Sequence, residues 1–426
     1  MASNSTRVEI YDLNLPSTTS DALEASKTEH EMTFSQAIRI HRKAVVWSAV
    51  VSLATIMDGY DLQIMTAFYG YPSFQKKYGV QLDDGSYSIP ASWQLGLNLA
   101  SNFGLIVGGF FNGWLVEHVG PRRMMIYSYI ALAGFIFISF FAPRIEVLLV
   151  GSLFCGIPWG VFATIAPLYA AETERNLKIG SSYIDCFRGT NLRRTEIASV
   201  SWGGQVLTGF AIQNYITYFF TLAGLASSNA FKLSLGVFGA ALLCTVFSWL
   251  LQSRFGRREI YIIGLCVMTP IMLLVALLDF TAPSSARNWG QCSMIVVWYG
   301  IFGLSVGPIP FAIATEVPAS RLRTKTIAIS RNTYYVLSTI NVVATPYLIN
   351  PTAGNLKGKA AFPAAGFSLM LLFWAWFRLP ETKGRTFEEL DVMFEQKISA
   401  RIFGSIVLNA DELERSHGTT VEQSKC

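Results

Sequence analysis

Residues 93–116 read WQLGLNLASNFGLIVGGFFNGWLV, a run without a single Asp, Glu, Lys or Arg. A second run without charged residues covers residues 290–315. Runs of about 20 apolar residues are long enough to cross the ~30 Å hydrocarbon layer of a bilayer as helices. Of the 426 residues, 52% are apolar and 14% are charged, whereas a soluble domain has about 25% charged residues. The sequence therefore predicts an all-α polytopic membrane protein and excludes the classes of soluble enzymes.

The chain has no sequence pattern of a metal site, a disulfide framework or an ATP-driven pump. Its six cysteines are scattered, without CxxC spacing, at positions 155, 186, 244, 266, 292 and 426. The four histidines are too dispersed for a ligand cluster, and no G-x-x-x-x-G-K-[ST] loop is present. We therefore expect no metal, no cofactor and no enzymatic activity. The modest net charge of +5 gives no indication of a nucleic-acid partner.

Windows poor in charge predict ten membrane-spanning helices. Their approximate ranges are 44–66, 93–116, 124–142, 147–170, 197–222, 231–252, 259–280, 292–314, 329–349 and 361–379. An even number of spans places both termini on the same side of the membrane. The loops and flanks on that side carry many more Lys and Arg than those on the other, so the positive-inside rule predicts cytoplasmic termini. An integral membrane protein of the plasma membrane is expected.

Two predicted cytoplasmic loops resemble each other. Residues 113–123 read GWLVEHVGPRR and residues 251–258 read LQSRFGRR, and each joins a helix end to a glycine turn and paired arginines. Two predicted spans precede each loop in its half. Four spans follow the second loop, but only two follow the first before the charged segment 172–196. This imbalance predicts a six-plus-six transporter whose first half lacks two helices, and a natural ten-helix architecture is the alternative.

The same count divides the chain into five predicted parts. They are a cytoplasmic N-terminal tail (1–43), an incomplete helical bundle of four spans (44–171), a central cytoplasmic loop (172–196), a bundle of six spans (197–379) and a cytoplasmic C-terminal tail (380–426).

Several short motifs occur in an order that is typical of one transporter family. They are GYD over 59–61, the loop 113–123, PLYAAE over 167–172, GPIPF over 307–311, Glu316 followed by RLR over 321–323, and PETKGR over 380–385. Together they resemble the sugar porters of the major facilitator superfamily, most closely the fungal maltose and α-glucoside permeases. The resemblance implies that superfamily's fold, with about ten helices instead of twelve, and transport of a small-molecule sugar together with a proton.

The segment after Glu172 departs from the family pattern. The family continues with its helices five and six, whereas SSYIDCFRGTNLRRT over 181–195 resembles the central segment just before helix seven. The gap therefore lies where the unequal halves predict it. The family's helix-seven QQLSG corresponds to QVLTG over 205–209, with Val206 replacing a glutamine, and Leu105 stands where proton-coupled α-glucoside permeases have a glutamate.

Three residues are candidates for proton coupling, namely Asp61, Asp58 and Arg331. Both aspartates lie in an otherwise apolar predicted helix, where a central charge costs about 2.5–3.5 kcal/mol and usually faces a cavity or a partner. Burial raises the pKa of a carboxyl group, which suits reversible protonation. The resemblance assigns the coupling to the GYD aspartate, Asp61. The alternatives are solvation of both aspartates at the outer mouth and a role of Arg331 as a positive-inside anchor.

Sugar recognition requires amide and hydroxyl groups for the polyol edge and aromatic rings for the apolar face of the sugar. Gln205 lies in a charge-free predicted helix, and the resemblance makes it a sugar ligand. Asn341, Gln94, Trp298 and Tyr299 are weaker candidates. For the two aromatic residues the alternative is the interface belt or the packing, where most aromatic residues of membrane proteins lie.

Charged residues at the predicted cytoplasmic helix ends are interpreted as a latch between the two halves. Charge-assisted bonds at this end can hold the outward-facing state, while the halves rock around a site at the midplane. The predicted latch residues are Glu117, Gly120, Arg122, Arg123, Glu172, Arg257, Arg258, Glu316, Arg321 and Arg323.

Four functions are therefore weighed. The first is proton-coupled uptake of a maltose or α-glucoside type of sugar across the lipid bilayer. The second is a facilitative hexose porter, and the third is an inactive truncated form that arises from splicing or from the gene model. A sugar sensor that does not transport is the least favoured, because only a short tail without a recognisable module follows Pro380.

Overall fold

The computed structural model describes residues 72–81, 87–171, 182–210, 227–282, 284–349 and 356–404, with Arg39, Ile212, Gln213, Ile216 and Phe220 as isolated positions. The predicted first span, 44–66, lies outside the described residues together with Asp58 and Asp61. Glu172 lies outside them as well.

Three long helices form an N-terminal group, α5 (Ala91–Val119), α6 (Pro121–Phe140) and α7 (Ile145–Ala171). α5 and α7 approach each other closely, because a Cβ atom at Gly104 would lie only 2.2 Å from the Leu153 carbonyl oxygen. Small residues permit such close contacts between membrane helices. Gly120, with a φ of 86°, reverses the chain between α5 and α6.

A short segment precedes α5 and consists of α4 (Pro72–Tyr78) and the antiparallel strands β1 (Val80–Gln81) and β2 (Tyr87–Ser88). The Tyr78 hydroxyl donates to the Ala142 carbonyl oxygen at 2.7 Å. This bond holds the segment against the turn between α6 and α7.

The C-terminal group begins with the 3₁₀ turn η1 (Tyr183–Phe187). Its helices are α8 (Gly189–Leu207), α10 (Ser227–Arg254), α11 (Arg257–Leu278), α12 (Ser285–Leu304), α13 (Ile309–Glu316), α14 (Arg323–Ile349), α15 (Ala361–Arg378) and α16 (Phe387–Glu395). Three further 3₁₀ turns are η3 (Ser320–Leu322), η4 (Lys357–Ala360) and η5 (Ala400–Ile402). The largest hydrophobic core lies among α8, α11, α12 and α15 and includes Tyr261, Met268 and Leu371.

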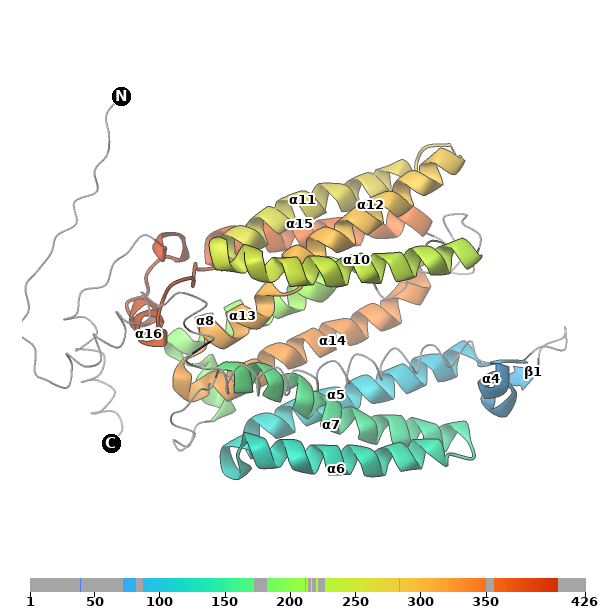
Figure 1. Cartoon of the computed structure of the whole chain (residues 1–426), viewed down its shortest axis with the longest axis horizontal. Coiled ribbons are helices and arrows are strands. Elements are labelled where there is room, and N and C mark those ends of the chain that lie inside the picture. Colours follow the sequence, from blue (N-terminus) through green and yellow to red (C-terminus); the bar gives the residue numbers. More distant parts are fainter. Residues whose placement is uncertain are drawn as a thin grey trace, which may run out of the picture.

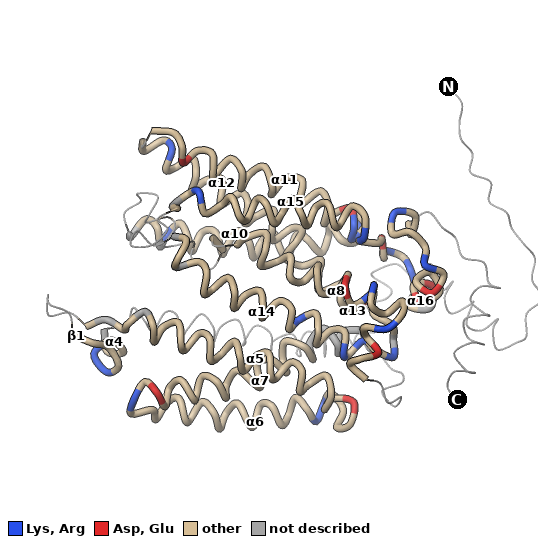
Figure 2. Tube along the Cα trace, turned by 180° about the vertical axis from the view of Figure 1, so that it is seen from behind, with Lys and Arg blue, Asp and Glu red and all other residues tan. Residues whose placement is uncertain are grey.

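The long helices run side by side in two groups that α14 connects (Figure 1). α5, α6 and α7 lie on one side, and α10, α11, α12 and α15 lie on the other. α14 packs against α8 and also against α5, and α7 contacts α13 and α14. Charged residues gather at the ends of the helices and are sparse along their middle, as Figure 2 shows. This distribution is the one expected of a bundle that spans a membrane.

Seven helical segments of the described part are long and apolar enough to cross a bilayer, namely Ser92–Val119, Pro121–Phe140, Ile145–Ile165, Lys232–Arg254, Arg257–Leu278, Ser285–Glu316, which combines α12 and α13, and Gly358–Arg378, which combines part of η4 with α15. Each coincides with a predicted span. The predicted span 329–349 belongs to α14, which is 27 residues long but more polar, and the start of 197–222 belongs to α8. The all-α membrane fold is thus confirmed.

One predicted span is interrupted. Residues 292–314 were expected to form a continuous helix, but the chain leaves the helix between α12 and α13 at residues 305–308. The reason is local, because Pro308 and Pro310 have no N–H to donate to the preceding turn. The break places carbonyl groups inside the bundle, where a side chain or a ligand can bind them.

Candidate functional site

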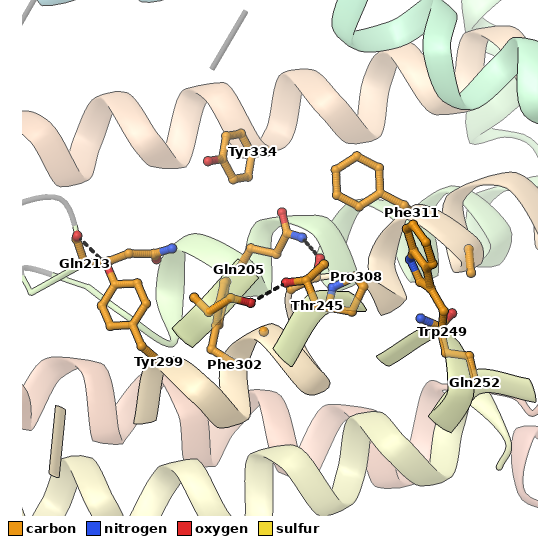
Figure 3. A pocket seen from close by; sticks show the side chains of 14 residues that line it. Gln205, Gln213, Thr245, Trp249, Gln252, Tyr299, Phe302, Pro308, Phe311 and Tyr334 are labelled. Atoms are coloured by element: carbon orange, nitrogen blue, oxygen red, sulfur yellow. Dashed lines mark hydrogen bonds between the residues drawn. The ribbon is translucent and has the colours of Figure 1, made fainter. Parts of the chain in front are cut away.

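A cavity of about 570 Å³ lies within the C-terminal group, between α8, α10, α12, α13 and α14. The polar side chains that line it are Gln205, Gln213, Thr245, Gln252, Tyr299 and Tyr334 (Figure 3). Its aromatic walls include Trp249, Phe302 and Phe311. Asp, Glu, Lys and Arg are absent from the described lining. Such a lining suits an uncharged polyol that has both hydroxyl groups and an apolar ring face.

Gln205 is fixed by the break between α12 and α13. At the break, the Phe311 N–H donates to the Pro308 carbonyl oxygen at 3.2 Å and leaves the neighbouring Gly307 carbonyl oxygen available. The Gln205 side-chain amide donates to this Gly307 oxygen. This bond orients the Gln205 amide, whose own oxygen points toward the side of the cavity that Tyr334 forms (Figure 3). The predicted sugar ligand therefore lines the cavity in a defined orientation.

Two hydroxyl groups of the cavity are held by backbone carbonyls. The Tyr299 hydroxyl donates to the Gln213 carbonyl oxygen at 2.6 Å, and Thr245 Oγ1 donates to the Ala241 carbonyl oxygen at 2.9 Å (Figure 3). Each hydroxyl oxygen has two lone pairs and donates only one proton. Both groups are thus able to accept hydrogen bonds from a sugar hydroxyl.

An ion pair joins the two helix groups at the predicted cytoplasmic end. Lys325 Nζ, near the start of α14, lies 2.7 Å from both carboxylate oxygens of Glu117 on α5. The two side chains are only 2% and 14% exposed, so the pair is largely shielded from water. Sequence reasoning selected Glu117 but missed Lys325. The only signal for Lys325 is its position two residues after Arg323, at the basic start of a helix.

The turn η1 packs into the same junction. The Tyr183 hydroxyl donates to the Phe110 carbonyl oxygen of α5 at 2.6 Å, and its ring centroid lies 5.8 Å from Lys325 Nζ. Gly113 makes room for this ring, because a Cβ atom there would lie 2.1 Å from the Tyr183 hydroxyl oxygen. Burial raises the pKa of Tyr183, so its hydroxyl stays protonated and keeps donating.

A second charged cluster connects α11, α13 and the segment after α15. Arg257 donates to Glu316 at 2.9 and 3.3 Å, and Thr382 donates to the same carboxylate. Glu381 accepts the backbone N–H groups of Arg257 and Arg258 at 2.8 and 3.1 Å. We predicted contacts between the halves for these arginines and for Glu316. The contacts instead lie within the C-terminal group, because the segment after α15 folds back over the start of α11.

The sequence model of the family described as "Sugar (and other) transporter" matches residues 47–174 and 173–394, which is most of the chain. The chain belongs to this sugar transporter family. It is therefore an integral membrane transporter and not an enzyme. The two matched segments meet at residues 173–174, the position at which the unequal halves predict missing helices.

Curated relatives from Saccharomyces cerevisiae resemble the transporter over nearly its whole length. The general alpha-glucoside permease is 28% identical over 509 positions, which cover 93% of this chain and 82% of that protein. The alpha-glucosides permease MPH3 is 30% identical over 517 positions, which cover 95% and 85%. Both alignments are longer than the 426 residues of this chain, so each relative contains residues without a counterpart here.

Solved structures of the superfamily share the fold. The proton:xylose symporter XylE bound to 6-bromo-6-deoxy-D-glucose matches with a TM-score of 0.66 at 15% identity, over 82% of this chain and 98% of that chain. The inward open conformation of XylE from E. coli matches with a TM-score of 0.53 at 15% identity, over 82% and 99%. The resemblance to the major facilitator sugar porters that the motifs indicated is thus confirmed.

Three of the weaker candidate ligands lie away from the described lining of the cavity. Trp298 is fully buried in α12 and stacks on Phe302. Asn341 accepts a hydrogen bond from Thr345 within α14. Gln94 donates to the carbonyl oxygen of Ile89, just before α5. A polar residue in an apolar helix can satisfy its hydrogen bonds locally, and the sequence alone does not show this. Tyr299, by contrast, lines the cavity.

Sequence reasoning also missed polar residues of the cavity. Thr245 and Gln252 lie seven residues apart on α10, a spacing that places both side chains on the same face of the helix. This spacing is the signal that could have identified them, together with the otherwise apolar sequence of α10. Gln213, which follows α8, has no comparable pattern around it.

Arg331 lies behind one wall of the cavity. It is 8% exposed, and its Nε donates to the Tyr335 hydroxyl at 3.1 Å. Its guanidinium carbon lies 4.7–5.9 Å from the ring centroids of Trp202, Phe311, Tyr334 and Tyr335. Phe311 and Tyr334 also line the cavity, so a single layer of rings separates Arg331 from it. Leu105 belongs to the same hydrophobic cluster as Tyr335.

The remaining predicted latch residues divide into exposed and packed ones. Arg122, Arg123 and Arg321 are exposed at the surface. Arg323 is only 5% exposed, and its guanidinium carbon lies 4.0 Å from the ring centroid of Phe387 on α16.

A contact that the sequence did not indicate attaches α16 to the start of α8. The buried Arg194 forms an ion pair with Asp391 on α16 and lies 4.6 Å from the Phe394 ring centroid. Arg193 donates to the Ile398 carbonyl oxygen at 2.8 Å. The segment after α15 is thereby fixed to the beginning of the C-terminal group.

Proposed function

We propose that this transporter takes up a sugar of the α-glucoside type, such as maltose, and binds it in the cavity around Gln205. The observation that carries the proposal is the lining, in which an oriented amide and two oriented hydroxyls face aromatic rings without a charged group. The names of the yeast relatives, permeases for alpha-glucosides and for maltose, support this choice of sugar.

Coupling to protons is the second part of the proposal. Asp61 is the proposed proton carrier, with Asp58 beside it in the sequence and Arg331 as their electrostatic partner. One proton that crosses a potential of 100 mV contributes about 2.3 kcal/mol, which is enough to accumulate a neutral sugar. The position of Arg331, one ring layer from the cavity, supports an influence of its charge on the occupied site. The similarity in fold to XylE, a proton:xylose symporter, also supports coupling.

Alternating access completes the proposal. The Glu117–Lys325 pair would hold the predicted cytoplasmic side closed while the cavity is reached from outside. Its rupture would let the two groups rock around the cavity and open it to the cytoplasm. This direction of uptake assumes cytoplasmic termini in the plasma membrane, which is the orientation that the positive-inside rule predicts.

The test is uptake of radiolabelled maltose by proteoliposomes that contain the full chain under an imposed pH gradient. Gln205→Ala should reduce maltose affinity about tenfold, because it removes one to two hydrogen bonds of the site. Gln94→Ala is the matched control, since Gln94 bonds to the backbone away from the cavity. Equal uptake by both variants would refute the site. If maltose uptake persists after a protonophore has collapsed the pH gradient, transport is facilitative and not coupled to protons.

An inactive truncated form is the second candidate. The observation that favours it is the length of the relatives' alignments, together with a family match in two segments that meet at residues 173–174. Sequencing the transcript across the codons for residues 172–177 tests it. Additional codons for two helices at this position would show that the 426-residue chain is not the transporting form.

A further inference from the structure

One wall of the cavity is formed by α10. Ala241, Thr245, Trp249 and Gln252 all line it. They are spaced by four, four and three residues, so they form one stripe along the helix. Thr245 and Gln252 make this stripe polar, which is unusual for a helix of such apolar sequence.

A second stripe of α10 is apolar and exposed. Leu242, Val246 and Leu250 are 67%, 48% and 65% exposed. Each follows a cavity-lining residue by one position, which places the second stripe about 100° around the helix. In the described part of the chain, α10 packs chiefly on α12 and α11, and neither covers this stripe. Such a face suits contact with lipid chains.

Trp249 is in the first stripe, at the edge that adjoins the second. It lines the cavity and is nevertheless 68% exposed. The wall of the cavity at this ring is therefore exposed, next to the apolar stripe of α10. Trp249 lies five residues before Arg254, the last residue of α10, which places it near the headgroup level of the membrane. From there the apolar stripe runs toward the membrane centre.

We propose that the cavity also accepts amphipathic glycosides. The sugar head would lie near Gln205, Thr245 and Gln252, and the alkyl chain would leave past Trp249 and lie along Val246 and Leu242. Along this path the alkyl chain stays in contact with apolar side chains and lipid, which favours its binding. This inference rests on the proposed function, because it uses the same sugar site.

The test uses the full chain in phosphatidylcholine nanodiscs and an octyl α-glucoside whose chain ends in a photoreactive diazirine. After irradiation, peptide mass spectrometry should find the label concentrated on residues 238–250 of α10. Excess methyl α-glucoside, which has the same head and no chain, should remove this label. Trp249→Ala should reduce labelling several-fold, whereas Trp289→Ala, at a half-exposed tryptophan of α12 outside the cavity, should not.

The outcomes separate the two proposals. Label that is spread over the exposed faces of α6 and α15 and is insensitive to methyl α-glucoside would show simple partition into the bilayer and overturn the inference. If maltose binding still depends on Gln205 in that case, the proposed function stands without it. If neither maltose nor methyl α-glucoside binds, the proposed function fails and the inference fails with it.

Discussion

The ion pair between Glu117 and Lys325 predicts a large effect of a small substitution. Glu117→Gln preserves the shape of the side chain but removes the carboxylate partner of Lys325, whose side chain is only 2% exposed. At 2.7 Å and an effective dielectric constant of about 20, the attraction between the two charges amounts to ~6 kcal/mol. Desolvation offsets part of it, and removal of one member of a buried pair costs about 3–5 kcal/mol. A loss of about 3 kcal/mol would raise the population of the open cytoplasmic end about a hundredfold.

Cys186 provides a reporter for this opening. Its thiol is fully buried in η1, and Thr326, the residue after Lys325, bonds to its sulfur at 3.7 Å. The substitution is made in a background whose only cysteine is Cys186. A membrane-permeant maleimide should then label the Cys186 thiol up to about a hundredfold faster in Glu117→Gln than in the same background without the substitution. The control is Arg123→Gln, which removes an exposed charge from the same loop and should leave the rate unchanged.

Two further variants separate opening from unfolding. A chain whose only cysteine is Cys155, 4% exposed in α7, should remain slow to react in the Glu117→Gln background. The double variant Glu117→Leu with Lys325→Met should keep Cys186 protected, because apolar side chains of similar size often replace a buried ion pair without loss. Equal labelling of Cys186 in Glu117→Gln and Arg123→Gln would refute the role of the pair.

Three other predictions concern the packing of the predicted cytoplasmic end. Gly113→Ala should displace Tyr183 at a cost of about 1–3 kcal/mol and thereby lower the thermal unfolding temperature. Gly134→Ala is the control and should not lower it, because the space around the Cβ position of Gly134 is open. Arg194→Ala should release α16, and limited trypsin digestion should then cleave at Arg385, while the exposed Arg188→Ala should leave α16 protected. Burial raises the pKa of Glu196, but bonds from Arg378 and Trp374 outweigh it, so the net pKa lies below the ordinary value. Stability from this carboxylate is therefore present above its unfolded pKa of about 4.3 and is lost as pH falls through the folded pKa. Acidification below about pH 4 should lower the unfolding temperature of the parent chain more than that of Glu196→Gln.

The membrane helices were predictable because the bilayer imposes a simple rule on sequence. A span must be long and nearly free of charge, and the runs around residues 93–116 and 361–379 show this without reference to any partner. The boundaries of α6 and α11 lie within three residues of the predicted ones, since proline or charged residues mark their starts. The break before Pro308 was not predicted, because hydropathy ignores the missing N–H of proline.

The candidate site was predictable only in part. Gln205 was found because its motif resembles that of the family, and Glu117 because a conspicuous loop contains it. Their partners were not found. Lys325 is 208 residues from Glu117, and the Gly307 carbonyl is 102 residues from Gln205, so no local pattern connects them.

By itself, the sequence determined that this chain is a helical membrane protein of the sugar porter type, and it predicted an unequal number of helices in the two halves. Composition and short motifs carry that information, because lipid selects residues one helix at a time. Only the tertiary structure decided which polar groups meet. It turned Asn341 and Gln94 toward local bonds, brought Thr245 and Gln252 to one cavity and left Trp249 exposed at the wall of that cavity. These outcomes depend on the rotation and packing of neighbouring helices, which residues far apart in the chain determine together.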